Sequence, residues 1–256
     1  MAMNILVCVK LVPSTTQVEL DGQFRLKRDG TSLQLNIADL SALECALRLK
    51  AEQPGSEITV LSMGPAKAES VLADVFPLGV DRIVLLCDIA LAGADSLATA
   101  RTLATAAKRL GTFDCILCGR RALDAETGQI PGQLAAALDI PVITNVQNIA
   151  ICGDAIACDR RLENGVSHLR LNTPAVLSLC EYCYCLRLPS ILGRRKALGK
   201  KVELLTAADV GLQADMCGLK GSATKVTHVD TKAPGLRKCK HITINDMVTV
   251  IREVDR

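Results

Sequence analysis

Short apolar runs alternate with longer stretches of helical periodicity along most of the chain. An apolar run bounded by glycine, proline or polar residues indicates a β-strand. Strands are predicted at about 4–11, 57–63, 82–87, 114–118 and 174–180, with a further one near 141–147. Strands separated by helices are typical of an open, mostly parallel sheet flanked by helices, so the pattern predicts an α/β fold.

The helices between these runs are marked by apolar residues three and four positions apart. One helix is predicted behind Asp39 as its N-cap, and a second over about 66–75. A third is predicted to start at Asp95, and a fourth to begin at Thr127 and end before Pro141.

Residues 149–172 show turn residues at Gly153-Asp154 and Asn164-Gly165. Such turns predict a pair of β-hairpins that projects from the sheet as an insert. We expect the sheet and its insert to form one domain over residues 1–198. Residues 199–256 are more polar and less periodic, so we expect them to form an arm that packs on a partner subunit.

Within this arm, Thr206 and Asp209 have the spacing of a capping box and predict a short helix. Asn245 could cap a last helix through Val254. Between them, residues 213–241 are rich in Lys, Gly and Pro and lack an apolar repeat. A segment of this kind becomes ordered by contact with a neighbour.

Composition narrows the function classes. The net charge is only +3 and aromatic residues make up 2% of the chain, so a nucleic-acid-binding module is disfavoured. No apolar stretch approaches the roughly 20 residues of a membrane span, and the start of the chain lacks the pattern of a signal peptide. Twelve cysteines without an export signal suggest free thiols in a reducing compartment, so we expect a cytoplasmic protein.

Two groups of cysteines invite a metal-site interpretation. Cys115 and Cys118 are three apart in one predicted strand, so they point to opposite faces and are expected to pack in the core. Cys180, Cys183 and Cys185 follow the last predicted strand, in what should be an exposed loop. They supply three thiolates where a closed zinc site needs four ligands, so we expect no metal.

The tyrosines of that loop point to a different role. Tyr182 and Tyr184 alternate with its cysteines in the run CEYCYC. Amphipathic rings of this kind are favoured at protein interfaces. We therefore expect the loop to be a docking surface.

Candidate chemistry concentrates in Cys115–Ala135, where an apolar strand runs into Gly119, two arginines and a polar turn. In open α/β sheets such a loop lies at the carboxyl ends of the strands, where ligands bind. Backbone N–H groups and guanidinium groups suit a phosphate. The alternative is that Gly119 turns the chain, Asp124 forms a turn and Thr127 caps a helix without any ligand.

Other nucleotide and catalytic motifs are missing from the sequence. It contains neither G-x-G-x-x-G nor G-x-x-x-x-G-K-[ST], so a dinucleotide dehydrogenase or P-loop enzyme is not supported. His168, His228 and His241 lie away from the predicted strand ends, and we expect surface positions for them. No nucleophile with an adjacent base is apparent.

Six segments in order resemble the electron transfer flavoprotein β subunit, over residues 1–178. They are NILVCVKLVPSTT at 4–16, ALECALRLK at 42–50, VLSMGPAKAESVL at 60–72, LGVDRIVLL at 78–86, AGADSLATA at 92–100 and CILCGRRALDAETGQIPGQLA at 115–135. The resemblance implies a Rossmann-like sheet similar to the adenine nucleotide alpha hydrolases. It also implies an electron-carrier subunit, rather than a stand-alone enzyme, paired with an α subunit that holds another FAD.

The resemblance further implies a nucleotide, which is FAD or, alternatively, AMP with a structural role only. The run 92–99 and the combination of Asp124, Thr127 and Gln129 are more similar to the FAD-holding group of anaerobic bacteria, which favours FAD. Electrons would pass to or from an acyl-CoA dehydrogenase-type flavoenzyme, and NADH-driven electron bifurcation is an open alternative. The nucleotide-binding residues implied by the resemblance are Cys8, Asn36, Ile37, Ala38, Asp39, Met63, Gly64, Ser96, Thr99, Gly119, Arg120, Arg121, Ala122, Leu123, Asp124, Ala125, Glu126, Thr127, Gly128, Gln129 and Ile130.

The chain departs from the family pattern at two places. Asn36-Ile37-Ala38 stands where the family has Asn-Pro-Phe. Residues 179–185 replace a Leu-Asn-Glu-Pro-Arg-Tyr-like run, and in the family the loop with this run docks the dehydrogenase partner. The family pattern resumes at Leu188–Leu192, and its basic sequel is kept by Arg194, Arg195, Lys196, Lys200 and Lys201.

Overall fold

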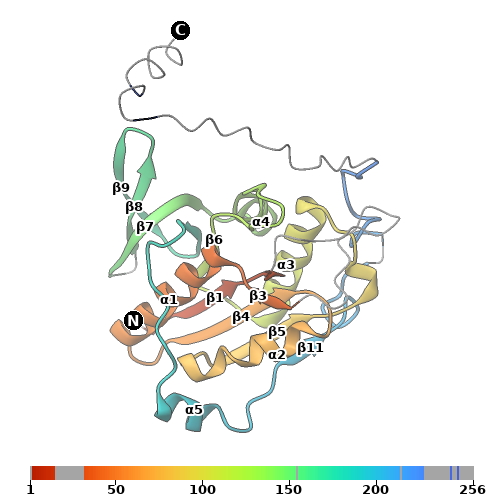
Figure 1. Cartoon of the computed structure of the whole chain (residues 1–256), viewed down its shortest axis with the longest axis horizontal. Coiled ribbons are helices and arrows are strands. Elements are labelled where there is room, and N and C mark those ends of the chain that lie inside the picture. Colours follow the sequence, from red (N-terminus) through yellow and green to blue (C-terminus); the bar gives the residue numbers. More distant parts are fainter. Residues whose placement is uncertain are drawn as a thin grey trace. The chain divides into compact units, whose positions relative to one another are not determined.

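The computed structural model describes residues 2–14, 32–153, 155–213 and 215–227, together with Thr243 and Met247. The chain divides into a compact unit, Met1–Lys225, and a second unit, Val226–Arg256. All the labelled helices and strands of Figure 1 belong to the first unit. His228, His241 and the predicted helix from Asn245 to Val254 lie outside the described residues.

The first unit is built on a nine-stranded sheet with the order β11-β5-β4-β1-β6-β10-β7-β8-β9. Its strands are Asn4–Cys8 (β1), Glu57–Met63 (β4), Arg82–Leu86 (β5), Cys115–Gly119 (β6), Val142–Cys152 (β7), Ala155–Leu162 (β8), Gly165–Asn172 (β9), Ala175–Leu179 (β10) and Glu203–Leu205 (β11). A separate antiparallel pair consists of Leu11–Pro13 (β2) and Leu33–Leu35 (β3). Only β7-β8 and β8-β9 are antiparallel in the large sheet, so the predicted open and mostly parallel sheet is confirmed.

Helices cover both faces of this sheet (Figure 1). They are Ile37–Glu52 (α1), Ala68–Ala73 (α2), Ser96–Leu110 (α3), Ile130–Leu138 (α4) and Ile191–Ala197 (α5), with 3-10 turns at Phe76–Leu78 (η1) and Ile89–Leu91 (η2). One buried apolar cluster joins α1 and α2 to one face, and a second joins α3 and α4 to the other. Cys115 belongs to the first cluster and Cys118 to the second, which confirms that these thiols lie on opposite faces in the core.

The strand predictions hold with two corrections. The predicted strand 4–11 is two strands, because the chain leaves the large sheet after Cys8 and β2 pairs with β3. The predicted strand near 141–147 and the first hairpin strand are one strand, β7, which begins in the parallel sheet and continues into the hairpins. The predicted hairpins are present, and they extend the edge of the sheet (Figure 1).

Two predicted helix starts are wrong. Helix α1 begins at Ile37 after Asn36, so Asp39 lies in its first turn and is not its N-cap. Helix α4 begins at Ile130, not at Thr127. Glu126 and Gly128 have φ values of 50° and 62°, and this left-handed backbone cannot continue a right-handed helix.

The third helix start is confirmed. Asp95 caps α3 by accepting a hydrogen bond from the backbone N–H of Ala98 at 2.9 Å. The other Asp95 oxygen accepts bonds from the backbone and hydroxyl of Thr224 at 2.9 and 3.0 Å. The cap therefore also fastens a distant segment of the chain to the helix.

Residues 199–225 belong to the compact unit, whereas the sequence placed a domain boundary near residue 198. Strand β11 pairs in parallel with β5 at the edge of the sheet. The capping-box bonds between Thr206 and Asp209 are present, although the segment that follows is a turn and not the predicted helix. Packing of an arm on a partner stays a prediction for residues 226–256.

The loop after β10 is not the exposed surface expected from the sequence. Cys180 is buried, Cys183 is half-buried, and only Cys185 is exposed. The Tyr184 hydroxyl accepts a bond from the Ile149 N–H at 3.2 Å, and the Arg48 guanidinium lies 4.9 Å from the ring centre. Tyr184 therefore braces α1 against β7 and is not free for docking, whereas Tyr182 is exposed.

The first turn of α1 places the buried carboxyl group of Asp39 beside the carboxyl ends of β1 and β6. Asp39 is 6% exposed, and its two oxygens accept bonds from the backbone N–H groups of Lys10 and Gly119 at 2.7 and 3.1 Å. Burial raises the pKa of Asp39 to about 7, although the bonds from Lys10, Asn36 and Gly119 act to lower it. The native carboxyl group thus holds a proton that the unfolded chain loses near pH 4.

This linkage predicts that the free energy of unfolding falls as the pH rises from about 4 to about 7. The contribution of Asp39 is fully present below pH 4, falls by at most about 1.4 kcal/mol per pH unit, and is lost above pH 7. Urea unfolding at a series of pH values should show this slope in the wild-type chain and in the exposed Asp74→Asn control, but not in Asp39→Asn. The same slope in Asp39→Asn would assign it to another group.

Candidate functional site

The loop after β6 begins with a backbone contact that only glycine allows. A Cβ at Gly119 would lie 2.2 Å from Oδ1 of Asp39 and 2.7 Å from the backbone of Ala38. Without a side chain, Gly119 lets the end of β6 approach the start of α1 closely enough for its N–H to reach Asp39. The start of α1 and the end of β6 therefore form one unit.

Asn36 fixes the next part of the loop. Its side chain is buried and lies between two backbone groups: Nδ2 donates to the Arg121 carbonyl at 2.9 Å, and Oδ1 accepts from the Leu123 N–H at 3.1 Å. The Asn36 backbone N–H also donates to the Lys10 carbonyl at 2.9 Å. One buried amide thus connects the segment after β1 with the loop after β6.

An ion pair completes this attachment. Lys10 Nζ lies 2.6 and 2.8 Å from the two oxygens of Asp124, whose side chain is only 11% exposed. Asp124 is therefore held by the segment that follows β1. The ion pair fixes this part of the loop to the segment after β1.

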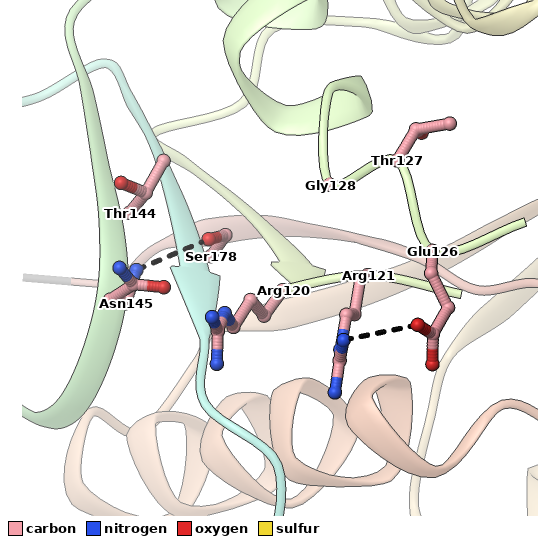
Figure 2. Close-up of a pocket in the computed structure, with 8 residues that line it drawn as sticks. All are labelled: Arg120, Arg121, Glu126, Thr127, Gly128, Thr144, Asn145 and Ser178. Atoms are coloured by element: carbon pink, nitrogen blue, oxygen red, sulfur yellow. Dashed lines mark hydrogen bonds and ion pairs between the residues drawn. The ribbon is translucent and has the colours of Figure 1, made fainter. Parts of the chain in front are cut away.

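Beyond these anchors the loop opens onto a polar pocket of about 270 Å³ (Figure 2). Its lining consists of polar and charged residues and one glycine, namely Arg120, Arg121, Glu126, Thr127, Gly128, Thr144, Asn145 and Ser178. Hydroxyl, amide and guanidinium groups are hydrogen-bond donors for anionic oxygen. The pocket can therefore receive a phosphate-bearing group.

The two arginines of the pocket differ in their partners. Arg121 Nε lies 3.0 Å from Glu181, and its Nη1 lies 3.4 Å from Glu126, so two carboxylates bracket this guanidinium. The hydrogen bond that Arg121 donates to Glu181 raises the pKa of Arg121. Arg120 has a longer contact of 3.7 Å to Glu181, and its head lies on the Asn145 side of the pocket in Figure 2. Arg120 is the guanidinium with more capacity for an added anion.

The loop residues predicted from the sequence lie together at the carboxyl ends of the central strands. Strands β4, β1 and β6 are neighbours, so Met63 and Gly64, Cys8, and the loop from Gly119 follow adjacent strand ends. The switch in strand order falls at β1, because the chain goes from β1 to β4 on one side and later to β6 on the other. This is where open α/β sheets bind ligands.

Helix α3 brings Ser96 to the same end of the sheet. The Ser96 hydroxyl donates to Oε1 of Gln129 at 2.7 Å, so the start of α3 contacts the loop before α4. Thr99 lies one turn further along α3 and is partly exposed. Among the other predicted residues, Ile37 and Ala38 form the first turn of α1, and Ala122, Ala125 and Ile130 belong to the loop and the first position of α4.

Three pocket residues were not identified from the sequence. Thr144 and Asn145 belong to β7, and Ser178 belongs to β10. The pairing of these strands shifts register between Leu177 and Leu179, and Asn145 has a φ of 60°. The Asn145 N–H reaches the Ser178 hydroxyl at 3.4 Å instead of a regular ladder partner. Polar residues inside the apolar runs VITNV and AVLSL were the signal that could have revealed them.

The described part of the chain offers no competing chemistry at this end of the sheet. No group of three or more His, Cys, Asp or Glu side chains in it could hold a metal ion. His168 is exposed on β9 and pairs with Asp159 at 2.7 Å, away from the pocket. No helix among the described residues is long and apolar enough to cross a membrane.

A family model and several similar proteins identify the family of this chain. The electron transfer flavoprotein domain model matches residues 23–210. An electron transfer flavoprotein subunit beta of Thermoanaerobacterium thermosaccharolyticum is 39% identical over 98% of this chain and 96% of its own length. The caffeyl-CoA reductase-Etf complex subunit CarD of Acetobacterium woodii is 36% identical, over 88% and 86% of the two chains. Protein FixA of Azorhizobium caulinodans is 35% identical, over 89% and 84%. The chain therefore belongs to the electron transfer flavoprotein β-subunit family.

Proposed function

We propose that this chain is the β subunit of a heterodimeric electron carrier and binds FAD at the carboxyl ends of β4, β1 and β6. The observation that carries the proposal is the polar pocket of the Gly119–Ile130 loop, held in place by Asn36 and Asp39. Its guanidinium and hydroxyl groups suit a pyrophosphate. Of the relatives, one is named as the beta subunit of an electron transfer flavoprotein and another as a subunit of a caffeyl-CoA reductase-Etf complex, which supports the proposal.

The pocket volume fits part of such a cofactor. About 270 Å³ is below the roughly 300–1,000 Å³ of sites that enclose a drug-sized ligand. The pocket would hold the phosphates, while the rest of the nucleotide lies along the strand ends at Cys8, Met63 and Gly64. Bound flavin would supply the redox chemistry, and the residues of this chain would bind and orient it.

The alternative is AMP with a structural role only. The same hydroxyl and guanidinium groups would serve its single phosphate, so the pocket itself does not favour one nucleotide. FAD is preferred because of two sequence features. The run at residues 92–99 and the combination of Asp124, Thr127 and Gln129 resemble the family members of anaerobic bacteria that hold FAD. NADH-driven electron bifurcation needs this second FAD and is proposed only with it.

We also propose where an acyl-CoA dehydrogenase-type partner docks. Residues 188–198, called here the docking segment, include α5 and contain no fully buried side chain. Leu188 and Ile191 are each 89% exposed, Leu198 is 80% exposed and Leu192 is 60% exposed. Exposed apolar side chains this close together mark an interaction site.

Charge indicates the kind of surface that the docking segment would meet. Arg194, Arg195 and Lys196 lie in the last turn of α5 beside these apolar residues. A partner pocket that is apolar inside and acidic at its rim would complement them. Lys200 is not part of this charged set, because its Nζ donates to the Val80 carbonyl at 2.9 Å and lies 5.4 Å from the centre of the Phe76 ring.

The nucleotide is identified most directly in the purified heterodimer. Coexpressed with its α subunit, this chain should give two FAD molecules per heterodimer, counted by visible absorption and by chromatography of the released nucleotides. One FAD and one AMP would support the structural-nucleotide alternative. One FAD and no second nucleotide would contradict both.

The phosphate assignment makes a separate prediction about the two arginines. Arg120→Ala should weaken nucleotide binding by about 1.5–3 kcal/mol, through loss of a charge-assisted bond. Arg121→Ala should weaken it by leaving Glu126 and Glu181 unneutralised, so adding Glu126→Gln to Arg121→Ala should restore part of the binding. Nucleotide retained by the heterodimer on dialysis measures both effects.

The exposed Arg101→Ala on α3 is the matched control and should retain nucleotide as the wild type does. A double variant that retains no more nucleotide than Arg121→Ala would show that Arg121 contacts the phosphate directly. Full retention in Arg120→Ala and in Arg121→Ala would refute the placement of the phosphates in this pocket.

A further inference from the structure

The docking segment is held by contacts at its two ends and at Gly193, while its leucine and isoleucine side chains are exposed and only Ala197 packs against the core. At its carboxyl end, Lys200 donates to the carbonyls of Val80 and Asp81 at 2.9 and 3.4 Å. Inside it, Gly193 packs so closely on the Pro77 carbonyl that a Cβ would lie 2.1 Å away. At its amino end the contact is made by Arg187, the residue directly before Leu188, which bonds to Glu44.

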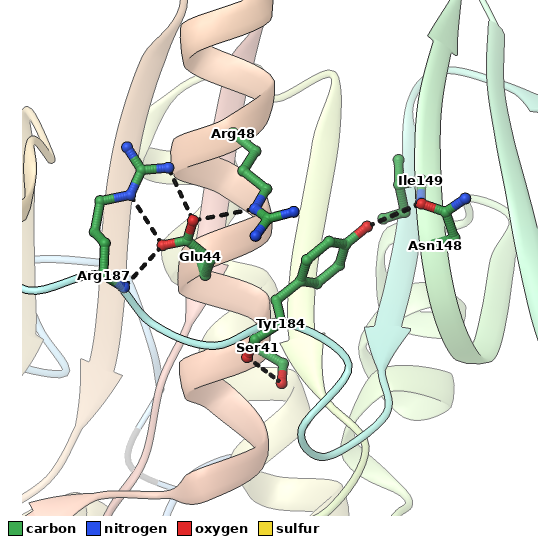
Figure 3. A network of polar contacts seen from close by, with 7 residues as sticks. All are labelled: Ser41, Glu44, Arg48, Asn148, Ile149, Tyr184 and Arg187. Atoms are coloured by element: carbon green, nitrogen blue, oxygen red, sulfur yellow. Dashed lines mark hydrogen bonds and ion pairs between the residues drawn. The ribbon is translucent and has the colours of Figure 1, made fainter.

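Arg187 is fixed by one carboxylate, that of Glu44 on α1 (Figure 3). Oε2 of Glu44 accepts bonds from the backbone N–H and Nε of Arg187 at 3.1 and 3.0 Å, and Oε1 accepts from Nη2 at 2.9 Å. Arg48 adds a bond from its Nε to Oε1 at 3.1 Å. The backbone and the side chain of Arg187 are both bonded to Glu44. These bonds set the direction in which the chain continues from Arg187 into the docking segment.

Glu44 is suited to hold this position firmly. It is 3% exposed and lies in the middle of α1, most of whose residues are buried. Burial acts to raise its pKa, but the hydrogen bonds from Arg187 and Arg48 outweigh burial and leave the pKa below its usual value. The carboxylate is therefore charged at neutral pH, and a charged bidentate pair is both strong and directional.

We propose that Glu44 is a positioning residue for partner docking: by holding Arg187, it presents the exposed apolar residues of the docking segment in a fixed orientation. The inference rests on the proposed docking function of residues 188–198. Glu44 is itself too buried to touch a partner. Its effect is to remove, before binding, the conformational freedom that docking would otherwise have to remove.

The first test measures order in the docking segment without any partner. Trypsin cleaves after Arg194, Arg195 and Lys196, and the rate in the purified heterodimer reports how often the segment leaves its native conformation. Glu44→Gln should raise this rate roughly tenfold, with nucleotide content unchanged. Arg187→Lys keeps the positive charge but cannot bond to both Glu44 oxygens as the guanidinium does, and should raise the cleavage rate in the same way. Glu52→Gln, an exposed change on the same helix, should leave it unchanged.

The second test measures docking. With a purified short-chain acyl-CoA dehydrogenase and butyryl-CoA as electron donor, Glu44→Gln should raise the KM for the heterodimer roughly tenfold and leave kcat unchanged. Arg187→Lys combined with Glu44→Gln should add little, because both changes remove the same contact. Leu192→Ala should raise KM without a change in the cleavage rate.

The outcomes separate the inference from the proposed function. Unchanged cleavage in both Glu44→Gln and Arg187→Lys would overturn the positioning role. Faster cleavage with an unchanged KM in both variants, while Leu192→Ala raises KM, would overturn the link between positioning and docking. An unchanged KM in Leu192→Ala would contradict the docking segment itself.

Discussion

The start of α1 is the point on which the candidate site depends. Asn36 and Asp39 are buried polar side chains, and together they bond to the backbone of Lys10, Gly119, Arg121 and Leu123. Buried polar groups are tolerated only when their hydrogen bonds are made, so these contacts fix each backbone segment closely. The ends of β1 and β6 are thereby joined at the place where the order of the strands reverses.

The same helix contacts a second region further along, through Ser41, Glu44 and Arg48. Ser41 donates to the Tyr184 carbonyl at 3.3 Å, Glu44 accepts a bond from Arg187, and the Arg48 guanidinium lies over the ring of Tyr184. The loop after β10 also reaches the pocket, since Glu181 contacts both Arg120 and Arg121. Helix α1 and this loop thus connect the proposed nucleotide site with the docking segment through described contacts.

Much of this arrangement followed from the sequence, for identifiable reasons. The apolar runs gave the parallel strands, and the opposite faces of Cys115 and Cys118 followed from strand geometry alone. Local patterns failed where long-range contacts decide. Thr127 resembles a helix cap, but the positive φ values of Glu126 and Gly128 form a turn instead. Tyr184 resembles an interface residue, but its hydroxyl bonds to β7. Ser178 and Asn145 reach the pocket only through a register shift that the sequence does not reveal.

Hydrogen–deuterium exchange of the purified heterodimer reports whether Asn36 holds the loop that forms the proposed nucleotide site. In the wild-type protein the amide of Leu123 should exchange slowly, because it donates to the buried Asn36 side chain. In Asn36→Ala, exchange should become much faster across residues 119–128 while β4 and β5 keep their protection. Unchanged exchange in that loop would show that Asn36 does not hold it.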